Sequence, residues 1–350
     1  IHLSLDYDDK SVRKAVAQQL RIEEKSIKSC KIFRRSVDAR KKDNIYFLTT
    51  IDAELNINED KVCKKCGNAQ IARKYEYNQM KFGNAPSPIV VGAGPAGLFA
   101  ALILARSGAN PILIERGCDV DRRTADVNRF WTSGQLDTTS NVQFGEGGAG
   151  TFSDGKLNSG TKDIRQRKVL EEFVSHGAPD EILYNAKPHI GTDMLKGTIK
   201  NIRNEIIELG GRVMFETKLV SMAFSDNKLK SITFETANGD EIIETDNVIL
   251  AIGHSARDTF YMLHERELSM NPKAFAIGVR VEHLAHLINE SQYGEGYPEE
   301  VPTASYKLTH QCKGTGRGIY SFCMCPGGYV VNSSSEKGRL CVNGMSYHDR

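Results

Sequence analysis

The chain has 350 residues, of which 40% are hydrophobic, and its formal net charge at pH 7 is +2. This length suffices for roughly two or three domains, and no apolar run approaches the ~20 residues that a membrane-spanning helix needs. The near-neutral charge gives no reason to expect nucleic acid or an anionic membrane as a partner. Eight cysteines are scattered along the chain, which indicates a cytoplasmic protein with reduced thiols rather than a small disulfide-rich secreted one. Because the first residue is Ile1, the possibility of a removed targeting peptide stays open.

Residues 1–82 are predicted to form a separate small α+β domain. The residue pattern predicts a strand over 1–5, a helix over 9–20 with Ser11 as its cap, and strands over 27–36 and 44–55. Two or three strands around one helix favour a ferredoxin-like arrangement. A run rich in glycine and proline over 82–88 then predicts a linker and a domain boundary.

The strongest motif of the chain lies in residues 89–101. An apolar strand, 89–91, leads into three glycines spaced as G-x-G-x-x-G, namely Gly92, Gly94 and Gly97, and a helix follows. The first glycine permits the turn, the second lets a pyrophosphate approach the backbone, and the third lets the helix pack closely on the strand. The next apolar run ends in Glu115, about 20 residues further on, where a carboxylate can hold a ribose hydroxyl. We therefore expect a dinucleotide site, with a tight turn that binds no ligand as the alternative.

A second unusual run, over residues 144–157, reads FGEGGAGTFSDGKL. So many glycines exclude a stable helix or strand and predict a loop whose backbone amides can approach a flat or anionic ligand. The alternative is a flexible connector. The interleaved Phe144, Phe152 and Lys156 favour contact with a ligand.

The elements after this loop indicate which dinucleotide to expect. Helices are predicted over 120–130, 164–176 and 194–209, and strands over 212–215, 219–224, 229–235, 241–244 and 245–253. A β-α-β unit followed by a helix, a strand, a small antiparallel meander and a last apolar strand is typical of flavoproteins with a dinucleotide fold. A simple NAD dehydrogenase domain usually lacks the meander. The order favours FAD over NAD and predicts a Rossmann-like FAD-binding domain over 83–264.

Residues 265–342 are predicted to form a strand-rich second subdomain that covers the flavin and holds the substrate. Alternating strands are predicted over 275–281, 318–324 and 329–332. Nothing in these residues names a substrate.

Several longer motifs accompany the glycine fingerprint and the loop over 145–157. They are SVDARKK at 36–42, IGHSARD at 252–258, FAIGVRVEH at 275–283, FCMCPGG at 322–328 and NGMSY at 343–347. With them, nearly the whole chain resembles the uncharacterised FAD-dependent dehydrogenases, a family of FAD/NAD(P)-binding oxidoreductase-like proteins found mainly in bacteria. The resemblance implies FAD binding in a three-layer fold. It also implies a C-terminal truncation, with 343–350 as the start of a return to the FAD-binding domain.

The resemblance to this fold further implies which residues contact FAD. The pyrophosphate is expected at Gly92, Gly94, Pro95, Ala96 and Gly97, and the ribose at Glu115. Other expected contacts, with adenine, the pyrophosphate or the flavin, are Arg116, Gly147, Gly148, Ala149, Gly150, Thr151, Ser153, Leu219, Ala251 and Gly253. NAD(P)H is a candidate electron donor.

The sequence offers only weak candidates for catalysis. Lys156 is a candidate partner for a reduced, anionic flavin, with an ordinary surface lysine as the alternative. Cys323 and Cys325 lie one residue apart on a predicted strand and could relay electrons if one thiolate were stabilised; the alternative is two small buried apolar residues. Cys63 and Cys66 form a C-x-x-C motif, but a structural zinc site needs about four ligands, and no metal is expected. Incidental surface cysteines in a polar turn are expected, with a zinc site or a dithiol redox pair as the alternatives.

The leading hypothesis is an FAD-dependent oxidoreductase that moves a hydride between an unknown small-molecule substrate or NAD(P)H and FAD. One alternative is a non-catalytic flavin- or nucleotide-binding sensor, or an RNA-associated protein, with the N-terminal domain as the recognition module. The absence of an aromatic and basic pattern weighs against RNA. Another alternative is an NAD-binding enzyme without flavin, against which the meander and the glycine loop weigh. The oligomeric state stays open.

Overall fold

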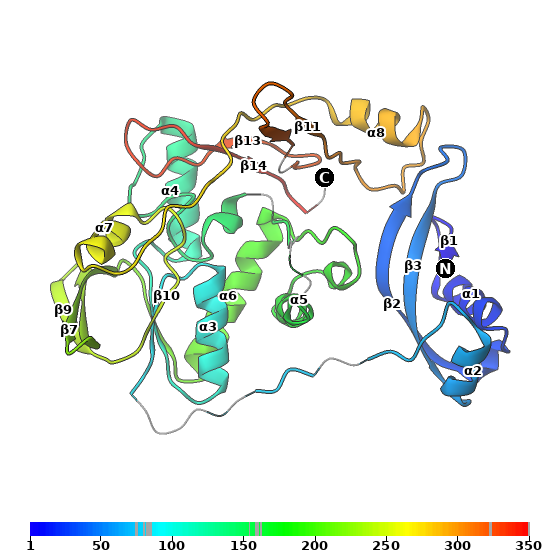
Figure 1. Ribbon diagram of the computed structural model, residues 1–350, viewed down its shortest axis with the longest axis horizontal. Helices are drawn as coiled ribbons and strands as arrows, with labels where there is room; N and C mark the ends of the chain where they lie inside the picture. Colours follow the sequence, from blue (N-terminus) through cyan, green and yellow to red (C-terminus); the bar gives the residue numbers. More distant parts are fainter. Residues whose placement is uncertain are drawn as a thin grey trace.

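A computed structural model describes residues 1–73, 76–79, 81, 86–153, 155–157, 161, 163–321 and 324–348. Figure 1 shows an N-terminal unit at one end of the molecule and a parallel sheet with its helices in the middle. The C-terminal part then runs back across the molecule to the N-terminal unit and returns. In the part of the chain that is described, no helix has both the length and the apolar character needed to cross a membrane.

The N-terminal unit is a three-stranded antiparallel sheet with helices. Its elements are β1 (His2–Leu3), α1 (Asp9–Leu20), η1 (Glu24–Ser26), β2 (Ile27–Asp38), β3 (Tyr46–Leu55) and α2 (Glu59–Lys65). The strand order is β1-β3-β2, with β3 antiparallel to both neighbours, which is the split β-α-β of ferredoxin-like folds. The prediction of Ser11 as the helix cap was wrong. Asp8 is the N-cap and accepts from the Ser11 amide, while the Ser11 hydroxyl accepts from the Asp8 amide, so the two form a capping box.

The central sheet is parallel and has the strand order β10-β4-β5-β6. Its strands are β4 (Ile89–Val91), β5 (Ile112–Ile114), β6 (Arg212–Met214) and β10 (Val248–Leu250). Because side chains alternate along a strand, Val90 and Leu113 face one side of the sheet and pack against Leu102 and Ile202 of the helices. Ile89 and Ile112 face the other side.

The two faces of this sheet are covered by different layers. On one face lie α3 (Pro95–Arg106), α5 (Arg165–Ser175), η3 (Asp180–Leu183) and α6 (Thr192–Glu208). On the other lies the antiparallel meander of β7 (Lys218–Ser225), β8 (Lys228–Thr236) and β9 (Gly239–Glu244), whose Ile232 and Phe234 are fully buried. This arrangement confirms the predicted three-layer, Rossmann-like fold. The remaining elements of this region are α4 (Val120–Ser133), η2 (Ala149–Phe152) and α7 (Arg257–Glu265).

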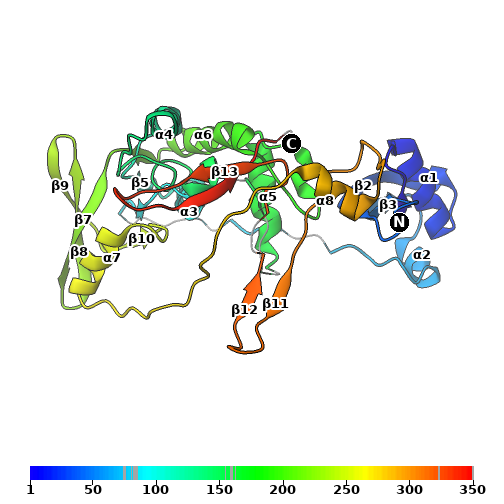
Figure 2. The ribbon, with the colours of Figure 1, turned by 90° about the horizontal axis from the view of Figure 1, so that it is seen from above.

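The C-terminal part consists of one helix and two hairpins. Its elements are α8 (Ala285–Tyr293), β11 (Thr309–Gln311), β12 (Gly318–Tyr320), β13 (Tyr329–Asn332) and β14 (Val342–Met345). Tyr293 and Val301, at and after the end of α8, pack against Leu5 and Val37 of the N-terminal unit. Figure 2 shows the β11–β12 hairpin projecting away from the body of the molecule.

The predicted strand over 275–281 was wrong. No strand is assigned to these residues, and the side chains of Phe275, Ile277 and Val279 are 84–90% exposed. The alternation of apolar residues fits a strand, but a strand also needs a neighbour to bond its backbone, and no described segment pairs with this one. Of the strand predicted over 318–324, the part over 318–320 forms, while residues 322 and 323 lie outside the described residues.

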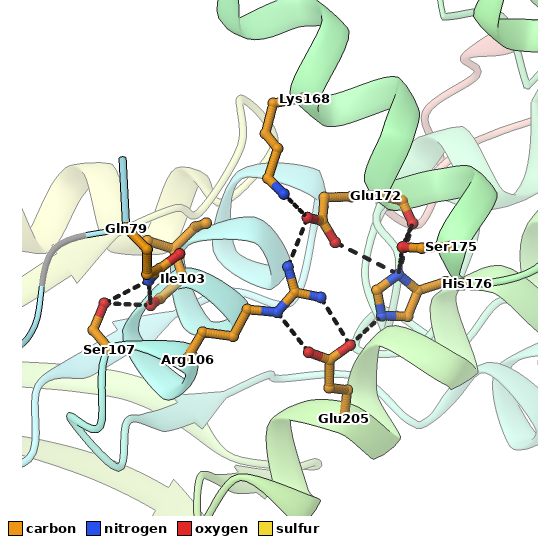
Figure 3. Close-up of polar contacts among 9 residues, drawn as sticks. All are labelled: Gln79, Ile103, Arg106, Ser107, Lys168, Glu172, Ser175, His176 and Glu205. Atoms are coloured by element: carbon orange, nitrogen blue, oxygen red, sulfur yellow. Dashed lines mark hydrogen bonds and ion pairs between the residues drawn. The ribbon is translucent and has the colours of Figure 1, made fainter. Parts of the chain in front are cut away.

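A network of charged side chains joins α3, α5 and α6 near their C-terminal ends (Figure 3). Arg106 Nη1 donates to Glu172 Oε1 at 2.6 Å, and its Nη2 donates to Glu205 Oε2 at 2.9 Å. His176 Nε2 lies 2.8 Å from Glu205 Oε2, and Lys168 pairs with Glu172. Burial raises the pKa of Glu172, but hydrogen bonds from Arg106 and Lys168 outweigh it, so the pKa is lowered. Hydrogen bonding by Arg106 is also the main cause that lowers the pKa of Glu205.

Replacing Arg106 by methionine is expected to lower the free energy of unfolding at pH 7 by about 1–2 kcal/mol. The loss is limited because Lys168 and His176 still pair with the two carboxylates. Because the folded-state pKa values of Glu172 and Glu205 are lowered, this stabilisation is fully present at a pH above the unfolded-state pKa of about 4.3. It is lost as the pH falls through the folded-state pKa values. Urea unfolding should therefore show a smaller difference at acid pH. A pH-independent difference would contradict this account, and the exposed Arg165→Met, whose partner is Asp163, serves as the control.

Candidate functional site

A cavity of about 550 Å³ opens at the carboxyl ends of the parallel strands. Val91, Ile114 and Leu250, the last residues of β4, β5 and β10, line it. Open α/β sheets bind their ligands at this edge. The predicted site residues that line the cavity are Gly92, Gly94, Pro95, Ala96, Glu115, Arg116, Gly148, Ala149, Leu219, Ala251 and Gly253.

The three glycines of the turn have distinct surroundings. Gly92 has φ +101°, and a Cβ there would lie 2.5 Å from the carbonyl oxygen of Ala251. A Cβ on Gly97 would lie 1.8 Å from the carbonyl oxygen of Gly92, so helix and strand meet too closely for any side chain. A Cβ on Gly94 would meet nothing nearer than Gly148 Cα at 3.9 Å. Gly94 thus leaves open a space at the cavity wall that a bound group can enter.

The N-terminus of α3 adjoins this space. Gly94 is its N-cap, Pro95 is its first residue, and no side chain caps the helix. The first N–H groups of a helix have no partner within it, and the helix dipole adds positive potential there. Because Gly94, Pro95 and Ala96 line the cavity, this end fits an anionic group such as a pyrophosphate.

Glu115 is the buried acid of the site. Its Oε2 accepts from the Ala93 amide at 2.7 Å, and its Oε1 accepts from the amides of Gly117 and Gly145 at 2.9 and 3.0 Å. A carboxylate has about four lone-pair positions, so one on Oε2 stays open to a ribose hydroxyl. From the sequence, the only role predicted for Glu115 was a contact with the ribose. The structure adds that Glu115 holds the glycine turn and the glycine loop together.

Arg116 is fixed in the cavity wall by Asp258. Its guanidinium donates to both Asp258 oxygens at 3.0 and 3.2 Å and lies 4.6 Å above the centre of the Phe144 ring. Lys218 pairs with the same carboxylate at 2.9 Å. Burial raises the pKa of Asp258, but hydrogen bonds from Arg116 and Lys218 outweigh it and lower that pKa to about 2. Asp258 therefore stays ionised and keeps Arg116 in place.

The glycine loop is organised by Arg123 of α4. This side chain is fully buried, and its five N–H groups donate to five backbone carbonyls, those of Asn141, Val142, Gly145, Glu146 and Gly148. Burial lowers its pKa to about 10, while the charges of Glu115 and Glu146 act in the opposite direction. The sequence analysis missed this residue. A signal was available, because Arg123 lies on the same helical face as Val120 and Val127, which are buried.

The remaining predicted cofactor contacts do not line the cavity. Thr151 is fully buried, and its hydroxyl has no hydrogen-bond partner among the described residues. The Ser153 carbonyl accepts from the Ser346 amide of the C-terminal part at 3.4 Å. Gly97 packs inside the turn, and Gly147 and Gly150 lie elsewhere in the loop.

The sequence analysis also missed Gln143, which lines the cavity. Its Nε2 donates to the Ser333 carbonyl at 2.6 Å, and its Oε1 accepts from the Ser255 hydroxyl. Trp131 Nε1 donates to the Asn332 carbonyl at 2.7 Å. These contacts join the C-terminal part to the cavity wall, and a contact between segments so far apart in sequence has no local signal.

Of the weak catalytic candidates, Lys156 and Cys325 are not among the residues that line the cavity. Lys156 Nζ and Cys325 Sγ lie 3.6 Å apart although 169 positions separate them, whereas Cys323 lies outside the described residues. In the C-x-x-C motif, Cys66 is buried and its Sγ donates to the Gln19 carbonyl, while Cys63 is half-buried. Among the described residues, no three His, Cys, Asp or Glu side chains gather as a metal site.

Three family models match parts of the chain. Residues 274–350 match "FAD-dependent protein, C-terminal domain-like", residues 87–124 match an FAD binding domain, and residues 1–54 match a domain of unknown function. An uncharacterized protein of Clostridium beijerinckii is 48% identical over 356 residues, which cover all of this chain and 66% of that protein. The chain thus spans just under two thirds of the length of this relative.

Solved structures share a smaller part of the chain. Thermovibrio ammonificans THI4 is 16% identical, with a TM-score of 0.34 over 53% of this chain and 64% of that one. A flavoprotein/dehydrogenase from Cytophaga hutchinsonii is 17% identical, with a TM-score of 0.32 over 51% of this chain and 42% of that one. The two domain matches and the Clostridium relative agree with the three-layer fold. The chain fits an uncharacterised family of FAD-dependent proteins, with an FAD-binding-domain match at residues 87–124 and a match to the FAD-dependent C-terminal domain at residues 274–350.

Proposed function

We propose that this chain binds FAD in the cavity at the carboxyl ends of the strands. The observation that carries the proposal is that two complementary features meet there, the uncapped N-terminus of α3 and the buried carboxylate of Glu115. The first fits the pyrophosphate and the second fits the ribose. The open space at Gly94 gives the phosphates room to reach the backbone.

The lining of the cavity also supports one orientation of the cofactor. Leu219, Leu263 and Met270 are apolar residues of the cavity lining, and their side chains suit adenine. Gly148 and Ala149 border the N-terminus of α3, and we infer that the flavin continues past them towards η2. Glu115 is bonded to segments next to both regions, because its carbonyl accepts from the Thr217 amide, two residues before Leu219, and its carboxylate accepts from the Gly145 amide.

The activity that follows is an FAD-dependent oxidoreductase acting on a small-molecule substrate. When bound, FAD supplies the two-electron redox chemistry, and we propose that a hydride passes between FAD and the substrate or NAD(P)H. The residues of this chain bind and orient the cofactor. Arg123 and Glu115 hold the glycine loop in shape, and Gln143 ties the C-terminal part to the cavity wall.

An absorption spectrum of the purified chain, recorded after incubation with FAD and desalting, tests this proposal. We expect retained flavin bands for the wild type and weaker bands for Glu115→Gln, whose amide would face the backbone N–H groups that now donate to Oε1 or Oε2. A colourless wild-type chain would contradict FAD binding by these residues. If a colourless chain nevertheless bound NADH or NADPH, an NAD-dependent enzyme would replace the proposal. For a coloured chain, anaerobic bleaching by either nucleotide identifies the donor.

A further inference from the structure

Three segments that are distant in sequence meet beyond η2. Residues 155–157 run beside 188–190, where the Ile190 amide donates to the Gly155 carbonyl at 3.0 Å and the Leu157 amide to the Pro188 carbonyl at 3.1 Å. The third segment follows β14, and its Ser346 hydroxyl lies 2.9 Å from His189 Nε2. This packing fixes the backbone at Lys156, which forms a β-bridge with His189.

Cys325 reaches this junction from the turn before β13. Its Sγ lies 3.6 Å from Lys156 Nζ. A Cβ built on Gly344 would lie 2.4 Å from the same sulfur and 3.7 Å from Arg280 Nη1, so the thiol and a second cationic side chain border the same spot beside Gly344. Cationic groups favour the thiolate, which is the nucleophilic form of cysteine.

Four of the other described cysteines have different surroundings. Cys66 and Cys118 are buried, and burial raises the pKa of the Cys118 thiol, as it does that of the half-buried Cys30. Cys341 is the exposed cysteine among them, and the Ser333 hydroxyl donates to its sulfur. Cys325 is only half-buried, so it combines access for small reagents with a cationic neighbour at contact distance.

We propose that Cys325 is a modification site, a nucleophilic thiolate held by Lys156 that reacts with small electrophiles such as hydrogen peroxide. The thiolate sulfur attacks one peroxide oxygen, so an S–O bond forms as the O–O bond breaks. The sulfur is oxidised by two electrons to sulfenic acid, and the peroxide is reduced. The displaced hydroxide takes a proton from the Lys156 ammonium and leaves as water.

Alkylation with limiting iodoacetamide at pH 7, followed by peptide mass spectrometry, tests the proposal on the full chain. Fragment ions localise the label, and the other cysteines serve as internal references. We expect Cys325 to react faster than Cys341 although Cys341 is the more exposed. Lys156→Met should slow the alkylation of Cys325 about tenfold, the change in thiolate fraction that a rise of one unit in the thiol pKa produces. The alkylation rate of Cys341 should stay unchanged. Lys156→Arg should retain most of the rate. Dimedone should label the same cysteine after treatment with peroxide.

Rates that simply follow exposure, with Cys341 first, would overturn the proposal. A fast Cys325 that is unaffected by Lys156→Met would also overturn it, because Lys156 would then not hold the thiolate. If the variant unfolds, labelling of the buried Cys66 and Cys118 reveals it, and the comparison of Cys325 with Cys341 in the wild type still decides. The measurement is made without added FAD, so its outcome does not depend on the proposed cofactor.

Discussion

Replacing Arg123 by methionine is expected to lower the free energy of unfolding by about 3–5 kcal/mol and to abolish FAD binding. The guanidinium is the common partner of five backbone carbonyls between residues 141 and 148. Methionine fills a similar volume but donates no hydrogen bond. Each buried carbonyl left without a partner costs about 1–3 kcal/mol, unless the loop opens to water. An opened loop loses its contact with the Glu115 carboxylate, and the cavity wall is lost with it.

Urea unfolding and retention of FAD after desalting measure the two effects. Arg122→Met is the matched control, because Arg122 neighbours Arg123 on α4, is 61% exposed and pairs with an exposed Glu216. Its replacement should cost less than about 1 kcal/mol and leave FAD binding intact. Equal losses in the two variants would show that Arg123 does not organise the loop. The stability and the FAD retention of Arg123→Lys should fall between those of Arg123→Met and the wild type, because an ammonium has three donors where a guanidinium has five.

The part of the site that could be predicted from the sequence is the part set by neighbours along the chain. Gly92, Gly94 and Glu115 depend on spacing within one β-α-β unit, and all three line the cavity. The five carbonyls bound by Arg123 belong to a loop about 20 residues away. An arginine on the buried face of a helix indicates an unusual partner, but the pattern does not identify it.

The strand that was predicted wrongly and the contact that was not predicted both depend on segments that are distant in the sequence. The alternation over 275–281 is a property of the segment itself, whereas a strand requires a partner elsewhere in the chain. The contact between Lys156 and Cys325 depends on the packing of three distant segments. Sequence analysis named both residues as candidates for separate reasons, and only the fold brings them together.

Gly94→Ala and Gly97→Ala are expected to separate FAD binding from folding. At Gly97 an added methyl would lie 1.8 Å from the Gly92 carbonyl oxygen, so α3 must move away from the turn, at a cost of about 3 kcal/mol. This variant should lose both stability and FAD. At Gly94 the nearest atom would be 3.9 Å away, so folding should change by less than about 1 kcal/mol. The methyl would nevertheless occupy the space through which the pyrophosphate approaches the backbone, and FAD affinity should fall about tenfold or more.

Thermal unfolding and titration with FAD, followed by flavin fluorescence, measure both quantities on the same samples. Gly197→Ala is the control, because Gly197 lies within α6 and an added Cβ meets nothing within 4 Å. That variant should be as stable as the wild type or slightly more so and should bind FAD unchanged. Normal FAD binding by a stable Gly94→Ala variant would place the pyrophosphate elsewhere and count against the proposed orientation. Loss of FAD from Gly94→Ala at unchanged stability would instead locate the phosphates at the N-terminus of α3, since no other atom of the protein is disturbed.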